Sequence, residues 1–141
     1  MISNFKIENL QEIMNIWLQS NTQAHDFIPE SYWIGMVPVV KEMLPSANIY
    51  VYYHDDKIVG FIGLNDSHIE GIFIDPKYQS HGFGKQLLDY AKEISSTLTL
   101  NVYDKNMRAK SFYLRENFKI IEESIDSGTN EKELLMKWSQ N

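Results

Sequence analysis

The chain has 141 residues, 43% hydrophobic and 23% charged, an ordinary globular composition that predicts a single domain over residues 1–141. The lack of cysteine excludes disulfides and thiolate metal sites, and no spacing of His, Asp or Glu indicates another metal site. The net charge of −6, the lack of a long apolar run and the lack of a leader-like N-terminus predict a cytoplasmic protein without nucleic-acid or membrane partners.

The N-terminal segment predicts a short strand and an amphipathic helix. The strand is expected at residues 5–7, where Phe5 and Ile7 alternate with a polar residue. Asn9 is a candidate N-cap for the helix, and Glu12 would complete a pair that resembles a capping box. Apolar side chains then recur at the spacing of one helix face: Leu10, Ile13, Met14 and Trp17.

The middle of the chain predicts a second helix and then an antiparallel meander. The helix is expected to begin near Pro29 and to end before Pro45. Pro38 is expected to break or kink it, because proline lacks the N–H that a helix interior uses. Three strands joined by short polar turns follow, at residues 48–53, 58–64 and 68–74.

The C-terminal half alternates helices and strands. A helix over residues 82–96 separates strand 68–74 from strand 98–102, so these two strands are expected to be parallel. The remaining elements are a helix at 106–116 and strands at 118–124 and 133–138. The predicted order is therefore β-α-α-β-β-β-α-β-α-β-β.

The segment Tyr78–Lys85, which joins an apolar strand to a helix start, is suited to hold a pyrophosphate. Gly82 and Gly84 permit close backbone approach, and the first N–H groups of a helix have no partner within it. Leu87 replaces the third glycine of a dinucleotide-binding motif, and Gln86 replaces the Ser or Thr of a P-loop. These departures argue against a generic nucleotide-binding domain, and a surface loop that caps a helix remains the simple alternative.

Two segments resemble the GNAT superfamily of N-acetyltransferases. Gln79, Gly82 and Gly84 fill the pattern Q/R-x-x-G-x-G/A of its acyl-CoA loop. Residues 101–118 resemble its pattern N-V-x-x-x-N-x-x-A-x-x-F-Y-x-x-x-G-F, with Asn117 in place of glycine, and Asn is the next-best residue for a left-handed helix end.

The resemblance covers the whole chain and implies the GNAT fold of small bacterial single-domain members. That fold is α/β (α+β), with a central mixed, mostly antiparallel seven-stranded sheet, a splayed parallel strand pair and about four flanking helices. It also implies acetyl-CoA as co-substrate, with no metal. The residues that it assigns to the acyl-CoA site are Ile72, Phe73, Ile74, Gln79, Ser80, His81, Gly82, Phe83, Gly84, Lys85, Asn106, Phe112 and Tyr113.

Within this assignment Lys85 is expected to contact phosphate directly. For Ile72 and Ile74 the alternative is packing in the sheet core, and for Asn106 it is capping of the following helix.

The resemblance further implies an acyltransferase that moves an acetyl group to a primary amine by direct attack in a ternary complex. Tyr113 is the candidate acid for the departing thiolate, with aromatic packing as the alternative. Glu70 is the candidate base, because it lies two residues before Ile72, where many members of the family have a glutamate that deprotonates the amine, often through water. Strand alternation would put Glu70 on one face with Ile72 and Ile74, a strand bulge would alter this, and an ordinary exposed strand glutamate is the alternative. The alternatives are His68 and water.

The same resemblance places the acceptor near the first two helices, with the candidate contacts His25, Phe27, Tyr32, Trp33 and Asn101. A loop hydrogen bond for His25 and core packing for the aromatic residues are the alternatives. The acceptor is expected to be a small-molecule or peptide amine, and the residues do not identify which amine. They also leave open an acyl donor longer than acetyl, and whether the protein is a monomer or a homodimer. The alternative function is a non-catalytic acyl-CoA-binding module of the same fold.

Overall fold

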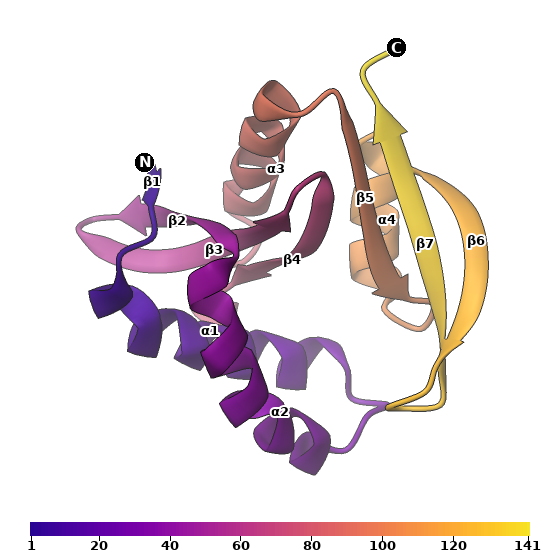
Figure 1. Cartoon of the computed structure of the whole chain (residues 1–141), viewed down its shortest axis with the longest axis horizontal. Helices are drawn as coiled ribbons and strands as arrows, with labels where there is room; N and C mark the ends of the chain where they lie inside the picture. Colours follow the sequence, from indigo (N-terminus) through magenta and orange to yellow (C-terminus); the bar gives the residue numbers. More distant parts are fainter.

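The computed structural model describes all 141 residues and contains one sheet that opens between two of its strands, β4 and β5 (Figure 1). In chain order the elements are β1 (Ile2–Asn4), α1 (Leu10–Ala24), α2 (Glu30–Met43), β2 (Asn48–His54), β3 (Lys57–Asn65), β4 (His68–Ile74), α3 (Phe83–Ile94), β5 (Thr97–Tyr103), α4 (Met107–Arg115), β6 (Lys119–Asp126) and β7 (Glu131–Ser139). None of these helices has the length and apolar character required to cross a membrane.

The seven strands lie in the order β1-β2-β3-β4-β5-β7-β6. Strands β4 and β5 are parallel, and all other neighbours are antiparallel. The parallel pair is joined through α3, as expected for strands separated by a helix. The predicted mixed, mostly antiparallel seven-stranded sheet with four helices is therefore confirmed.

Side-chain alternation divides the core into two layers, one on each face of the sheet. On the α3–α4 face, the buried helix residues are Phe83, Leu87, Leu88, Ala91 and Tyr113. On the α1–α2 face they are Ile13, Met14, Ile16, Trp17 and Trp33. The consecutive β3 residues Phe61 and Ile62 are both fully buried but belong to different layers, which explains why this central strand is almost continuously apolar.

Hydrogen bonding between β4 and β5 stops after two residue pairs. Only His68 and Ile69 of β4 have partners on β5, which are Thr99 and Leu100. Strand β4 stays paired with β3 and β5 stays paired with β7 along their full lengths, so the two halves of the sheet separate between β4 and β5. The C-terminal part of β4 consequently has a backbone edge without a strand partner.

A β-bulge at Glu70 lies where β4 departs from β5. Ile69 pairs with Leu64 and Gly71 pairs with Gly63, which leaves Glu70 as an extra residue. A bulge bends its strand and increases the local twist, so this extra residue accounts for the change in direction of β4.

The predicted start of the chain is wrong. The first strand is Ile2–Asn4, and Ile7–Asn9 forms a 3-10 turn in which Ile7 is 67% exposed and has no core to pack against. Asn9 already has helical backbone angles and gives α1 no side-chain cap. Its Oδ1 instead accepts from the N–H of Lys6 at 3.0 Å, so the predicted pair with Glu12 does not form.

Pro38 does not break the second helix. Helix α2 runs without interruption from Glu30 to Met43. Pro38 and Ile34 are both exposed. The carbonyl of Ile34, which loses its helical donor at Pro38, can therefore bond to water, and this lowers the cost of a proline inside the helix.

Asn117 ends α4 in the left-handed conformation, with φ of 73°. The N–H of Phe118 donates to the Tyr113 carbonyl at 3.0 Å, and the N–H of Asn117 donates to the Leu114 carbonyl at 3.2 Å. This is the Schellman pattern, which satisfies the last carbonyls of a helix.

We expect Asn117→Ala to lower the free energy of unfolding by about 1 kcal/mol, because alanine tolerates a positive φ less well than asparagine. Asn117→Gly should be at least as stable as the wild type, because glycine has no β-carbon. Urea unfolding of the three proteins measures the difference. Equal destabilisation by both changes would contradict a requirement for the left-handed conformation.

Candidate functional site

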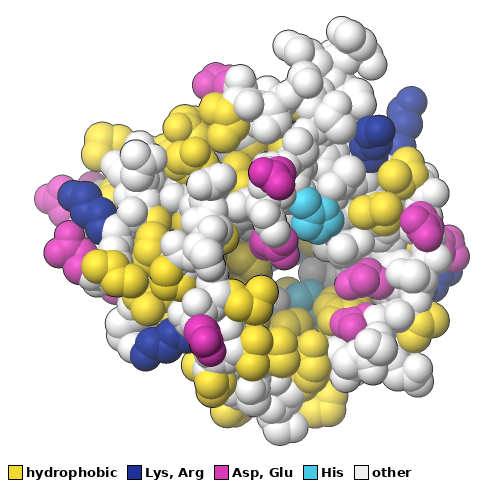
Figure 2. All heavy atoms as spheres, viewed as in Figure 1, with side chains coloured by type: hydrophobic (Ala, Val, Ile, Leu, Met, Phe, Trp, Pro, Cys, Tyr) yellow, Lys and Arg dark blue, Asp and Glu magenta, His cyan; other side chains and the backbone are white.

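A cleft of about 860 Å³ lies between the end of β4, the loop that leads into α3, the end of α1, and α4. Figure 2 shows one face of the molecule hollowed near its centre, with one histidine side chain at the rim, another deeper, and acidic side chains around it. The lining of the cleft itself contains one histidine, His25. The sequence-predicted residues that line the cleft are His25, Ile72, Phe73, Ile74, Gln79, Ser80, Gly82, Gly84, Lys85, Asn106, Phe112 and Tyr113. The predicted residues that do not line it are Phe27, Tyr32, Trp33, Glu70, His81, Phe83 and Asn101.

The end of β4 presents its backbone to the cleft while two of its side chains pack inward. Ile72 and Ile74 contact the core of the α3–α4 face, close to Gly84 at the start of α3. Phe73 points to the opposite face, where its ring lies 4.9 Å from the ring of Phe61. Because β4 and β5 have separated here, N–H and C=O groups along this edge of β4 have no ladder partner and are open to a ligand.

The loop between β4 and α3 ends in an anion-binding geometry. Gly82 is the N-cap of α3 with φ of 82°, which glycine adopts without strain. The N–H groups of Phe83, Gly84 and Lys85 have no acceptor within the protein. These free donors and the dipole of α3, a helix of 12 residues, favour a negatively charged group at this point.

Arg108 is a cleft residue that the sequence analysis missed. Its Nη1 donates to Gln79 Oε1 at 2.8 Å and its Nη2 donates to Ser80 Oγ at 2.9 Å. A residue at the start of α4 thus reaches across to the loop between β4 and α3, which contains Gly82 and is called the glycine loop below. Arg108 lies between Asn106 and Ala109 in the sequence pattern of residues 101–118, and this position was the signal that could have indicated a cleft residue.

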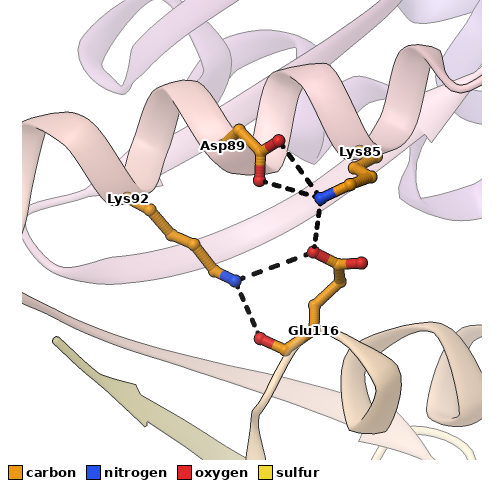
Figure 3. Close-up of polar contacts among 4 residues, drawn as sticks. All are labelled: Lys85, Asp89, Lys92 and Glu116. Carbon is orange, nitrogen blue, oxygen red and sulfur yellow. Dashed lines mark hydrogen bonds and ion pairs between the residues drawn. The ribbon is translucent and has the colours of Figure 1, made fainter. Parts of the chain in front are cut away.

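Lys85 is engaged by carboxylates instead of projecting freely into the cleft (Figure 3). Its Nζ lies 3.0 Å from Glu116 Oε1 and 3.2 Å from Asp89 Oδ2. Hydrogen bonds to Glu116 and Asp89 raise the pKa of Lys85. Lys92 Nζ donates to the backbone carbonyl of Glu116 at 2.7 Å, so Glu116 joins α3 to the end of α4. The predicted contact of Lys85 with phosphate stays a prediction, and it would compete with these ion pairs.

Tyr113 lies on α4 with its side chain at the cleft. It is 7% exposed, and its ring contacts those of Phe112 and Phe118 at 5.1 and 5.5 Å. The protein supplies no hydrogen-bond partner for its hydroxyl, and burial raises the pKa of the phenol well above its ordinary value. The group is therefore protonated at neutral pH and able to donate.

The bulge overturns the predicted position of Glu70. A β-carbon placed on Gly63, which alternation puts on the α1–α2 face with Phe61, would lie 3.8 Å from the Glu70 Cβ. Glu70 is therefore exposed on that face and does not share a face with Ile72. His68, the alternative base, is held by a 2.7 Å hydrogen bond between its Nδ1 and Thr99 Oγ1. Both carboxylate and imidazole lie outside the cleft lining.

The acceptor candidates form an aromatic cluster on the α1–α2 face. Trp33 stacks on His25 with ring centroids 5.1 Å apart, and its buried Nε1 has no hydrogen-bond partner. Phe27 and Tyr103 pack edge to face at 5.9 Å. The hydroxyl of Tyr103 donates to Asp126 Oδ2 at 2.5 Å. Burial raises the pKa of Tyr103, and this hydrogen bond raises it further.

Asn101 is exposed on β5 opposite Leu135 of β7, and only His25 of the acceptor candidates reaches the cleft. No group of three or more His, Cys, Asp or Glu side chains is placed to hold a metal ion.

Comparison with known proteins identifies close relatives of this chain. A family model described as an acetyltransferase (GNAT) domain matches residues 45–120. The peptidyl-lysine N-acetyltransferase YiaC of Escherichia coli (strain K12) is 31% identical over 140 residues, which cover 98% of this chain and 96% of YiaC. The solution structure of apo YjaB from E. coli has a TM-score of 0.87 at 31% identity, over 97% of this chain and 95% of YjaB. The PaiA N-acetyltransferase of Thermoplasma acidophilum, crystallised in complex with coenzyme A, shares the fold, with a TM-score of 0.85 at 20% identity over 99% of this chain and 98% of PaiA.

The ion-pair cluster of Figure 3 predicts unequal roles for its two carboxylates. Glu116→Gln should lower the free energy of unfolding by about 1 kcal/mol, because the Glu116 side chain is only 14% exposed and faces two lysines. Asp89→Asn, at a side chain 48% exposed, should change it by less than about 0.5 kcal/mol. Urea unfolding at low and high salt tests this, and equal effects of the two changes would show that Glu116 does not join the helices.

Proposed function

Because this chain belongs to the GNAT acetyltransferase family, we propose that it transfers the acetyl group of acetyl-CoA to the ε-amine of a lysine in a peptide or protein. YiaC and YjaB both carry the name peptidyl-lysine N-acetyltransferase. YiaC aligns with nearly the whole of this chain, including the segments that build the cleft. We further propose that residues 1–141 act as a single catalytic domain.

The observation that carries the proposal is the cleft that begins where β4 leaves β5. A pantetheine arm contains amide groups, and the unpaired backbone edge of β4 offers the complementary donors and acceptors. The free N–H groups at the start of α3 suit a pyrophosphate at the other end. The volume of about 860 Å³ is in the range of sites for large cofactors, so the residues present fit acetyl-CoA.

Transfer would proceed by attack of the neutral lysine amine on the thioester carbonyl. The new C–N bond forms as the C–S bond breaks, and the amine proton is removed while the thiolate gains one. We propose that a backbone N–H of Phe73 or Ile74, both of which line the cleft, polarises the carbonyl oxygen. Tyr113, protonated and without an internal partner, is the proposed acid.

Glu70 is the proposed base, and its place on the α1–α2 face has a consequence for how it acts. Since the side chain lies outside the cleft lining, we propose that it takes the amine proton through a water molecule. His68 is the competing candidate, because its Nδ1 is committed to Thr99 while its Nε2 has no partner in the protein.

Electrostatics favours a cationic acceptor. The net charge of −6 and the acidic side chains around the hollow of Figure 2 attract a protonated lysine. The attraction raises the rate of encounter and does not by itself select a particular peptide.

A thermal-shift titration tests the donor site. Acetyl-CoA at 100 times its dissociation constant should stabilise the protein by roughly 2.7 kcal/mol, because it binds only the folded state. For a domain of this size the midpoint should rise by roughly 5–10 °C. ATP and NAD at the same concentration are the controls. An unchanged midpoint with saturating acetyl-CoA would rule out the donor site.

Tyr113→Phe and Glu70→Gln test the proposed roles in catalysis. Each should lower kcat for acetylation of a lysine peptide by roughly 10²- to 10⁴-fold, because each removes one proton transfer. The affinity for coenzyme A, measured by calorimetry, should stay within about twofold. His68→Gln is the matched test of the competing base. If only His68→Gln slows turnover, Glu70 is not the base, and if none of the three does, the domain binds acyl-CoA without this mechanism.

A further inference from the structure

His25 connects the two sides of the cleft through a hydrogen bond to Asn106. His25 is the residue that follows α1, and Asn106 is the N-cap of α4, 81 residues further along the chain. His25 Nε2 lies 3.1 Å from Asn106 Nδ2, and its Nδ1 lies 3.0 Å from the carbonyl oxygen of Asn21. Both side chains line the cleft.

The backbone partners of the pair determine which atoms carry hydrogen. The Asn21 carbonyl can only accept, so His25 Nδ1 is protonated. The N–H of Ala109 can only donate, and it does so to Asn106 Oδ1 at 3.2 Å, so the amide nitrogen of Asn106 faces His25. His25 Nε2 therefore accepts from Asn106. A doubly protonated ring would bring two donors together and break the contact.

Packing holds the ring in place and favours its neutral form. His25 is 9% exposed, stacks on Trp33 and meets Phe27 and Tyr103 edge to face. Burial lowers the pKa of His25, and the hydrogen bond to the backbone opposes this in part. Titratable groups near the ring include Asp26, which follows His25 in the chain, Tyr103, whose ring meets it edge to face, and, beyond Phe27, Lys105, whose Nζ lies 5.6 Å from the Phe27 ring centroid and 3.1 Å from Glu131 Oε1.

We propose that neutral His25 is a positioning residue for acetyl transfer and acts through Asn106, an inference that rests on the function proposed above. His25 and the α4 cap use one N–H and one acceptor position of the Asn106 amide. The second N–H is therefore kept in one direction, available to a carbonyl of the amide-containing arm of the co-substrate. The same hydrogen bond holds the α1–α2 loop, on the acceptor side, against the start of the helix that carries Tyr113. Donor and acceptor are thus held in one relative geometry.

Two substitutions separate the hydrogen bond from the packing. His25→Phe keeps an aromatic ring against Trp33 but removes the acceptor, and it should lower kcat/KM for a lysine peptide roughly tenfold. His25→Gln restores an acceptor at the reach of Nε2 and should recover activity to within about threefold. His54→Phe, at a histidine on β2 outside the cleft lining, is the matched control and should leave activity unchanged. Equal losses for the Phe and Gln variants would overturn the proposal.

A double-mutant cycle tests whether His25 acts through Asn106. The variant carrying both His25→Phe and Asn106→Ala should be no worse than Asn106→Ala alone, because the second change removes what the first one positions. If the loss of kcat/KM in the double variant equals the product of the two single losses, His25 acts independently of Asn106. Coenzyme A affinity, measured by calorimetry on the same four proteins, should follow the same pattern.

Nitrogen-15 NMR of the histidine rings tests the proposal independently of enzyme activity. His25 should appear as the neutral tautomer with the proton on Nδ1, and burial should make it titrate at lower pH than an ordinary imidazole. The opposite tautomer, or a charged ring at neutral pH, would overturn the assignment. If no lysine peptide is acetylated by the wild type, the proposed function fails, while the ring tautomer and the coenzyme A affinities still decide the role of His25.

Discussion

The loss of pairing between β4 and β5 after Ile69 is the constraint on which the cleft depends. Every backbone N–H and C=O of a sheet interior needs a partner, so a strand that leaves its neighbour must find water or a ligand. The bulge at Glu70 turns the chain at that point, and the following loop delivers the start of α3 to the same opening. The unpaired strand edge and the unpaired helix N-terminus are thereby brought to one cleft, where they offer backbone groups to a ligand at two separate points.

Side-chain contacts across the opening take the place of the missing strand pairs. Arg108 bonds to the glycine loop, Glu116 to Lys85, and Asn106 to His25. The Arg108 contact is exposed to solvent and contributes little to stability, and Lys85, whose side chain is 55% exposed, can exchange Glu116 for an anion. The third is partly buried and involves the buried His25, so its loss would leave the His25 ring without this partner. The opening is therefore adjustable at the phosphate end and held firmly near the acceptor end.

Much of the fold could be predicted from the sequence because its signals are local. Apolar periodicity placed α1, and the helix between two apolar runs required a parallel pair. Asn117 was correctly placed at a left-handed helix end. The failures have equally specific causes. The first strand was misplaced because strand propensity at residues 5–7 has no partner or core there, and Pro38 is tolerated because the helix around it faces water.

For the candidate site the sequence by itself determined the glycine loop, the Asn106 cap and the presence of Tyr113 on α4, since each depends on the order of residues within one short segment. Only the tertiary structure decided how distant segments meet. It placed Glu70 on the α1–α2 face, engaged Lys85 with Glu116, and brought Arg108 to the loop and His25 to Asn106. The physical reason is that one bulged residue reverses the facing of a strand, and that contacts between residues far apart in the chain leave no periodic trace in the sequence.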